Sequence, residues 1–141
     1  MKRWIVGVFV MAVLATVSIA SDDIVGSWKT IDDKTGKAKS IVSIYKKGGE
    51  YFGKIEKLLI KNPDNPEQIC LNCKDERKNK SLIGMDIIEN MTMVDETLEN
   101  GTILDPENGK IYKCKIWLED GKLKVRGYIM FLYRTQTWHR K

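Results

Sequence analysis

The chain has 141 residues, of which 30% are charged and 43% hydrophobic, and its formal net charge is +5. This length is enough for one domain with a single core, and no low-complexity tract or repeat of solenoid length is visible. The lysines between positions 113 and 124 lie near Glu119 and Asp120. They therefore predict a solvated face rather than a nucleic-acid-binding surface.

The N-terminal segment has the three parts of an export signal. Lys2 and Arg3 precede an apolar run over residues 4–17, and Ser18 and Ala20 place small residues before position 21. This pattern predicts a signal peptide over 1–20 with cleavage after Ala20. The apolar run is shorter than the roughly 20 residues needed to span a bilayer. An uncleaved N-terminal anchor is the alternative.

If the signal is removed, the mature chain becomes a periplasmic or secreted protein of residues 21–141. It loses two basic residues, so its net charge falls to +3. It contains no second apolar run of membrane length. We therefore expect a protein that does not span a membrane after cleavage.

The rest of the chain predicts short strands separated by turn residues. Turns are expected at 32–37, 47–50, 99–101, 105–109 and 119–121, where glycines, Asp and Asn gather. The predicted strands are 24–30, 41–46, 51–60, 83–93, 102–104, 111–118, 123–129 and 134–140.

About eight antiparallel strands joined by tight turns favour an up-and-down β-barrel, an all-β fold that closes its own edges. A barrel of this size can hold one small ligand. A two-sheet sandwich is the competing architecture. It would need a crossover, for which only the segment 61–81 is long enough.

The polar segment 61–81 predicts a long loop that is functional or acts as a lid, near one mouth of the barrel. It contains Cys70 and Cys73, for which a local disulfide is the expected state in an oxidising compartment. A redox pair would normally open a helix, and a zinc site would need two further ligands. Cys114 lies on the apolar face of its strand and is expected to be a buried free thiol.

Several longer motifs now identify a family resemblance. They are the segments 23–28, 70–73, 82–84, 101–112, 123–128 and 134–138. Together they resemble the bacterial exported family known as domain of unknown function 2147. The resemblance implies a calycin-like, lipocalin-resembling barrel without an established activity. One departure is Tyr133, where many members have glycine, and it puts in doubt any pocket shape inferred from relatives.

Gly26 and Trp28 near the start, with Arg134 and Arg140 near the end, are similar to the plug of a lipocalin barrel. In that arrangement an arginine from the last strand packs over the indole ring through a cation–π contact. Arg134 and Arg140 are both candidates for that arginine. The alternative is that Trp28 is an ordinary core residue.

Catalytic patterns are poor in this sequence. The only histidine is His139, and neither a nucleophile elbow nor a phosphate-binding loop is present. Asp105 and Glu107 lie in a predicted turn, where such residues commonly bind their own backbone. We therefore expect that the protein is not an enzyme and that it binds neither a metal ion nor a cofactor.

The apolar and aromatic content leaves two functions open. A binding module would hold a small apolar or amphipathic ligand in the barrel interior, and an envelope interaction protein would have a filled barrel and a binding surface on the long loop. A thiol–disulfide oxidoreductase using Cys70 and Cys73 is a weaker third hypothesis. The sequence does not predict which protein partner, if any, the chain would bind. The tentative ligand-binding residues are Tyr45, Tyr51, Tyr112, Ile116, Tyr128 and Phe131.

Overall fold

The computed structural model describes residues 7–12 and 23–141. The predicted cleavage site after Ala20 and most of the predicted signal peptide lie outside these residues. Within the described part of the chain, no helix is long and apolar enough to cross a membrane. Among the described residues, those of the hydrophobic core lie between positions 24 and 138.

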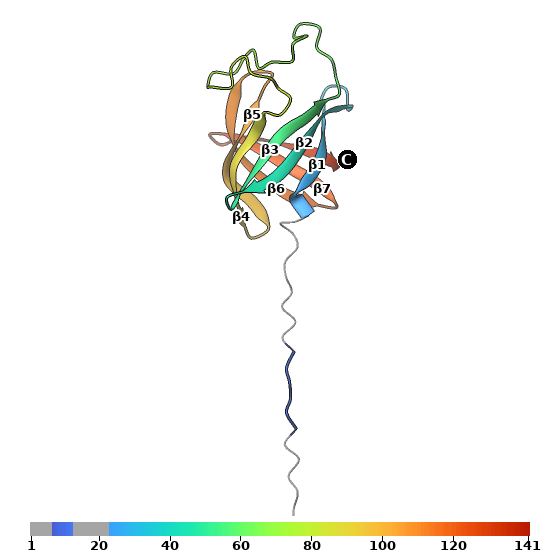
Figure 1. Ribbon diagram of the computed structural model, residues 1–141, viewed down its shortest axis with the longest axis vertical. Coiled ribbons are helices and arrows are strands. Elements are labelled where there is room, and N and C mark those ends of the chain that lie inside the picture. Colours follow the sequence, from blue (N-terminus) through green and yellow to red (C-terminus); the bar gives the residue numbers. More distant parts are fainter. Residues whose placement is uncertain (1–6, 13–22) are drawn as a thin grey trace, which may run out of the picture.

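Residues 26–140 form a closed antiparallel barrel in which each strand pairs with the next and the last pairs with the first (Figure 1). This topology confirms the predicted fold class of an eight-stranded up-and-down barrel. The strands are β1 (Gly26–Ile31), β2 (Ala38–Lys47), β3 (Glu50–Leu58), β4 (Asp86–Val94), β5 (Thr97–Asp105), β6 (Lys110–Glu119), β7 (Lys122–Ile129) and β8 (Leu132–Arg140).

The hairpin between β4 and β5 differs from its prediction. The turn is Asp95–Glu96, where both residues have positive φ, and the predicted turn at 99–101 lies inside β5. Asn100 also has a positive φ of 65°, and the register with β6 shifts between Leu98 and Gly101. The Asn-Gly pair therefore marks a bend within a strand, a use that its tolerance of positive φ equally permits.

The interior of the barrel is filled by side chains from every strand. Alternate residues point inward, as in β6, where Cys114 and Ile116 are buried while Lys113 and Lys115 are exposed. The largest side chains with under 2% exposure are Trp28, Trp138, Ile24, Ile44, Ile55, Ile88, Met91, Leu98, Ile116 and Leu123.

The seam between β1 and β8 is short. Only Trp28 with Arg140 and Lys29 with His139 are paired, whereas β7 pairs with β8 from Leu123 with Trp138 to Ile129 with Leu132. The part of β8 before Trp138 therefore lacks a β1 partner, and an ion pair between Arg134 and Asp33 spans this side of the barrel. Before His139, β8 is therefore held mainly by its ladder with β7, which is itself paired with β6.

Candidate ligand-binding cleft at the barrel mouth

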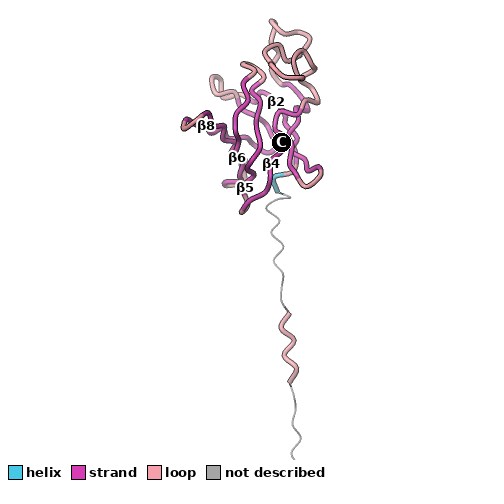
Figure 2. The backbone as a smooth tube through the Cα atoms, turned by 90° about the vertical axis from the view of Figure 1, so that its left-hand side faces the viewer, coloured by secondary structure: helices cyan, strands magenta, loops and turns pink. Residues whose placement is uncertain are grey.

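The segment 59–85, which joins β3 to β4, lies over one end of the barrel (Figures 1 and 2). Its two halves are joined by an isolated β-bridge between Ile69 and Ser81 and by a 2.9 Å hydrogen bond from the Cys70 amide to the Lys80 carbonyl oxygen. Leu82 and Met85 join the barrel core. The segment is therefore a packed cover rather than an open loop.

A disulfide between Cys70 and Cys73 forms within this cover, as the sequence predicts. Both cysteines are almost fully buried and belong to the hydrophobic core. Neither sulfur lies at the start of a helix among the described residues, and neither is exposed. The features that a redox role would require are thus not found at this pair.

Cys114 is the free cysteine of the barrel and is buried, again as predicted. Burial raises the pKa of its thiol to about 12. Because the thiolate is the reactive form, we expect an alkylating reagent at about pH 8 to leave all three cysteines of the native protein unmodified. Unfolding without reduction should expose one reactive thiol, and reduction in the unfolded state should give three, as counted by intact mass. Rapid labelling of Cys70 or Cys73 in the native protein would contradict the buried disulfide.

Arg77 ties the cover to β4. Its guanidinium donates to the carboxylate of Asp75 at 2.7 Å, to Glu89 at 2.6 Å and to the backbone oxygen of Asp86 at 2.9 Å. Burial acts to lower the pKa of Arg77, but the two carboxylates outweigh it and the pKa is raised. The hydrogen bonds from Arg77 lower the pKa of Asp75. Such charge-assisted bonds fix the position of the cover on the barrel wall.

The turn between β5 and β6 holds the cover from the other side. The Asn72 side-chain amide donates to the backbone oxygen of Glu107 at 2.7 Å. Gly109, with φ of 73°, lies so close that a Cβ atom there would overlap the Asn72 carbonyl. Lys39 of β2 forms an ion pair with Glu107. Three segments that are distant in the sequence therefore meet at this mouth.

A cleft of about 460 Å³ opens between the cover and the barrel rim. Its apolar lining comes from the end of β3, from the cover and from the β5–β6 turn, and its polar lining consists mostly of amides and carboxylates. The apolar residues are Leu58, Ile60, Leu71, Leu82 and Pro106; the polar residues are Asp32, Lys39, Asn62, Asp64, Asn65, Gln68, Asn72 and Glu107.

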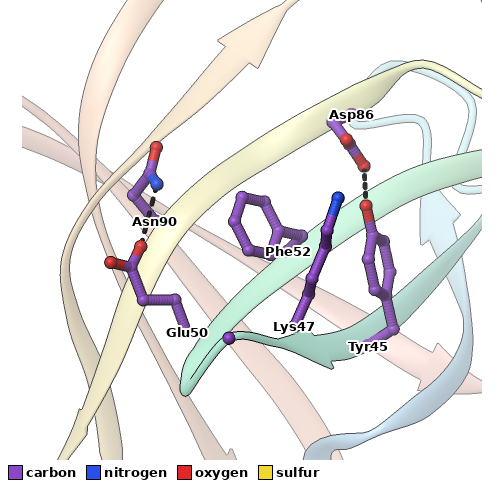
Figure 3. Close-up of a pocket in the computed structure, with 7 residues that line it drawn as sticks. Tyr45, Lys47, Glu50, Phe52, Asp86 and Asn90 are labelled. Carbon is purple, nitrogen blue, oxygen red and sulfur yellow. Dashed lines mark hydrogen bonds between the residues drawn. The ribbon is translucent and has the colours of Figure 1, made fainter.

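A second, smaller cleft of about 270 Å³ lies on the outer face of β2, β3 and β4 (Figure 3). Tyr45 donates a 2.5 Å hydrogen bond to Asp86, and its ring stacks on Phe52 with centroids 5.7 Å apart. Burial, followed by the bond to Asp86, raises the pKa of Tyr45 to about 12. Lys54 lies over the same ring. The aromatic faces are thus already occupied, which makes this cleft the weaker candidate.

The six tentative ligand-binding residues do not gather in one place. Tyr51 and Ile116 are buried in the core, whereas Phe131 is 88% exposed at the tip of the β7–β8 hairpin. Tyr45 lines the outer cleft, and Tyr128 stacks beside Tyr133 near the hairpin tip. Tyr112 accepts a hydrogen bond from Asn108 in the β5–β6 turn. None of the six lines the mouth cleft.

The residues of the mouth cleft were missed because most of them are polar residues of an irregular segment. Strand periodicity carries no information about such a segment. The length of the 61–81 loop was the one local signal, and it placed the loop near a mouth without indicating which side chains face the rim.

Of the two candidate arginines, Arg140 is the one that packs over Trp28. Its guanidinium carbon lies 3.9 Å from the centroid of the Trp28 ring, and its nitrogens donate to the backbone oxygens of Val25 and Asp23. Gly26 leaves room for this arginine, since a Cβ there would lie 3.1 Å from the guanidinium. Arg134, the other candidate, lies far along β8 and binds Asp33 instead.

The candidate carboxylates of the β5–β6 turn have structural contacts. Asp105 accepts a backbone hydrogen bond from Glu107 at 2.9 Å, and Glu107 binds Lys39. No cluster of three or more residues suited to a metal ion occurs among residues 7–12 and 23–141. Nothing in this arrangement pairs a nucleophile with a base.

The closed eight-stranded meander defines a lipocalin-like barrel. The chain belongs to the family described as "Uncharacterized protein conserved in bacteria (DUF2147)", whose model matches residues 26–140.

Among solved structures, the chain resembles protein HP1028 from the human pathogen Helicobacter pylori, which is described as belonging to the lipocalin family. The two share 19% sequence identity with a TM-score of 0.68, over 84% of this chain and 82% of the other. At this identity the likeness shows the fold alone. A comparison with curated proteins gives no significant match.

Proposed function

We propose that this protein is an exported binding protein that holds a small amphipathic molecule in the mouth cleft. The observation that carries the proposal is the cleft itself, about 460 Å³ in volume and lined by both apolar and polar side chains. Small-molecule sites typically measure about 300–1,000 Å³ and combine apolar walls with a few polar groups.

A position of the ligand at the mouth, rather than inside the barrel, is supported by the packing of the barrel. Side chains such as Ile88, Met91 and Ile116 have no more than 1% exposure and occupy the interior. The cover, in contrast, is held by a disulfide, by Arg77 and by the contact of Asn72 with the β5–β6 turn. A rigid rim of this kind lowers the entropy lost on binding.

The charged residues that line the cleft indicate which class of ligand it would bind. Asp32, Asp64 and Glu107 face the cleft together with Lys39, which is already paired with Glu107. Amide side chains supply further donors and acceptors. A neutral or cationic polar head on an apolar body therefore fits the cleft better than an anionic head.

Export is part of the proposal and is supported by the signal pattern of residues 1–20 and by the disulfide in the cover. A binding rather than a catalytic role is supported by the engagement of Asp105 and Glu107 in turn and ion-pair contacts. Native mass spectrometry of protein isolated from the cell envelope tests both proposals, since we expect a chain that begins at Ser21 and carries a bound mass.

Binding at the cleft is tested directly with N-phenylnaphthylamine, a neutral fluorescent amphipath, on residues 21–141. Leu71 lines the cleft and is 45% exposed, and Leu71→Asp should weaken probe binding about tenfold because it places a charge among the apolar lining residues. Val94→Asp is the matched control, since Val94 is 40% exposed and does not line the cleft. Equal affinity of the two variants for the probe would refute the mouth cleft as the site.

The sequence placed the surface of an envelope interaction protein on the 61–81 loop, but a different element supports such a role, the exposed apolar tip of the β7–β8 hairpin. Met130, Phe131 and Leu132 are 73–88% exposed there. This surface is separate from the mouth cleft, so the two functions do not exclude each other.

A further inference from the structure

The turn between β7 and β8 differs in residue composition from the other two-residue turns of the barrel. Those turns are Gly48–Gly49, Asp95–Glu96 and Asp120–Gly121, all of glycine or acidic residues. The β7–β8 turn is Met130–Phe131, and Met130 adopts a φ of 54°. Asn-Gly or a similar pair is the favoured choice at such a turn. The turn geometry therefore does not explain the apolar residues at this tip.

These apolar residues face solvent. Met130 is 84%, Phe131 is 88% and Leu132 is 73% exposed. Their hairpin projects from the side of the barrel, apart from the cover, as the strand labelled β8 shows in Figure 2. Exposed apolar groups gathered on one projection mark a surface that is buried by a partner.

Aromatic rings follow the tip along both strands. Tyr128 and Tyr133 are paired across the hairpin, with ring centroids 5.9 Å apart. They lie two residues from the turn, which is about 7 Å along a strand. Tyrosine, like tryptophan, is enriched where the hydrocarbon of a bilayer meets its headgroups.

Cations come next on the same outer face. Lys113 is paired with Tyr128, and Arg126, two residues further from the tip, lies 4.4 Å from the ring centroid of Tyr133. Lys115, opposite Arg126, lies over the ring of Tyr128 and also binds Glu99 at 3.6 Å. The order from the tip inward is thus apolar, aromatic and basic.

The charge of the whole region agrees with this order. Residues 110–141 contain nine Lys and Arg and only two acidic residues, whereas residues 23–109 contain more acidic than basic residues. The two acidic residues, Glu119 and Asp120, lie at the β6–β7 turn, at the end of these strands away from the tip. The strands β6, β7 and β8 therefore form a basic side of the barrel, and the apolar tip lies at the end of β7 and β8.

From this arrangement we propose that the β7–β8 hairpin docks the protein on an anionic phospholipid bilayer. Met130, Phe131 and Leu132 enter the boundary between headgroups and acyl chains, to the depth of about 5–10 Å that interfacial segments reach. The tyrosines lie at headgroup level, and Lys113 and Arg126 face the phosphates. The binding is peripheral and reversible, and it leaves the mouth cleft free.

The experiment is vesicle co-sedimentation of residues 21–141, with phosphatidylcholine vesicles and with vesicles containing phosphatidylglycerol at about one part in three. The test variant is Met130→Asn with Phe131→Gly, which removes the apolar tip and installs the favoured turn pair, so it keeps the hairpin folded. The control is Asp95→Asn with Glu96→Gly, which installs the same turn pair at the opposite end of the barrel.

We expect wild type to bind the anionic vesicles, the control to bind equally and the tip variant to bind at least about tenfold more weakly. Lys113→Gln with Arg126→Gln should also lower binding about tenfold, whereas Lys46→Gln with Lys57→Gln should not. Raising the salt to about 0.5 M should weaken wild-type binding, because the charge contacts are screened.

Equal binding by wild type and the tip variant, or no binding by wild type, would overturn the proposal. A wild type that ignores vesicles but self-associates in sedimentation velocity, with a monomeric tip variant, would also overturn it. The tip would then be an interface between two copies of the chain.

Discussion

Trp28→Ala should lower the free energy of unfolding by about 3–5 kcal/mol, the range for a large aromatic side chain that leaves a cavity in a core. Trp28 has no exposed surface, and its indole nitrogen donates a 2.8 Å hydrogen bond to the Ile24 backbone. Its ring is also the platform for Arg140. The substitution therefore removes core packing and the contact that joins the last strand to the first. Chemical denaturation followed by circular dichroism measures the loss.

Trp117→Ala is the matched control for this measurement. Trp117 lies only partly buried on β6, with the guanidinium of Arg126 4.9 Å from its ring centroid. Its loss removes a surface cation–π contact, for which about 0.5–1 kcal/mol is expected, together with some packing. If both substitutions lowered stability equally, or if Trp28→Ala cost less than about 1 kcal/mol, Trp28 would not be the plug of the barrel.

The fold was predictable because it rests on local patterns. In β6 and β7, buried and exposed residues alternate along the strand, and the sequence shows the same alternation of apolar residues with lysine and arginine. Asp120–Gly121 then gives the turn between them. At 99–101 the same kind of reasoning failed, because a positive φ at Asn100 serves a bend in β5 rather than a reversal of the chain.

The candidate site was not predictable because it is made of contacts between distant segments. Asn72 binds Glu107, and Arg77 binds Glu89, through pairings that have no periodicity in the sequence. The contact between Trp28 and an arginine shows the same limit, since the sequence motif named Trp28 but did not choose between Arg134 and Arg140. That choice depends on the register of β8, which sets Arg140 beside Trp28.

Gly109→Ala should have the second large effect, because it acts on the contact that holds the cover over the mouth. A methyl group at this position would overlap the Asn72 carbonyl, and the residue needs a positive φ of 73°. The left-handed backbone costs an alanine about 1–2 kcal/mol. Overpacking adds about 1–3 kcal/mol, unless the cover moves away to relieve it.

Gly121→Ala separates these two causes. Gly121 has a φ of 74°, almost the same as that of Gly109, but nothing lies within 4 Å of its added methyl group. The two variants thus share the backbone strain and differ in the contact with Asn72. We expect Gly121→Ala to bind N-phenylnaphthylamine as wild type does. Gly109→Ala should bind it about tenfold more weakly and be cleaved faster by protease within 59–85, because a displaced cover no longer shapes the cleft. Equal probe affinity and equal protease resistance in the two variants would mean that the Asn72 contact does not position the cover.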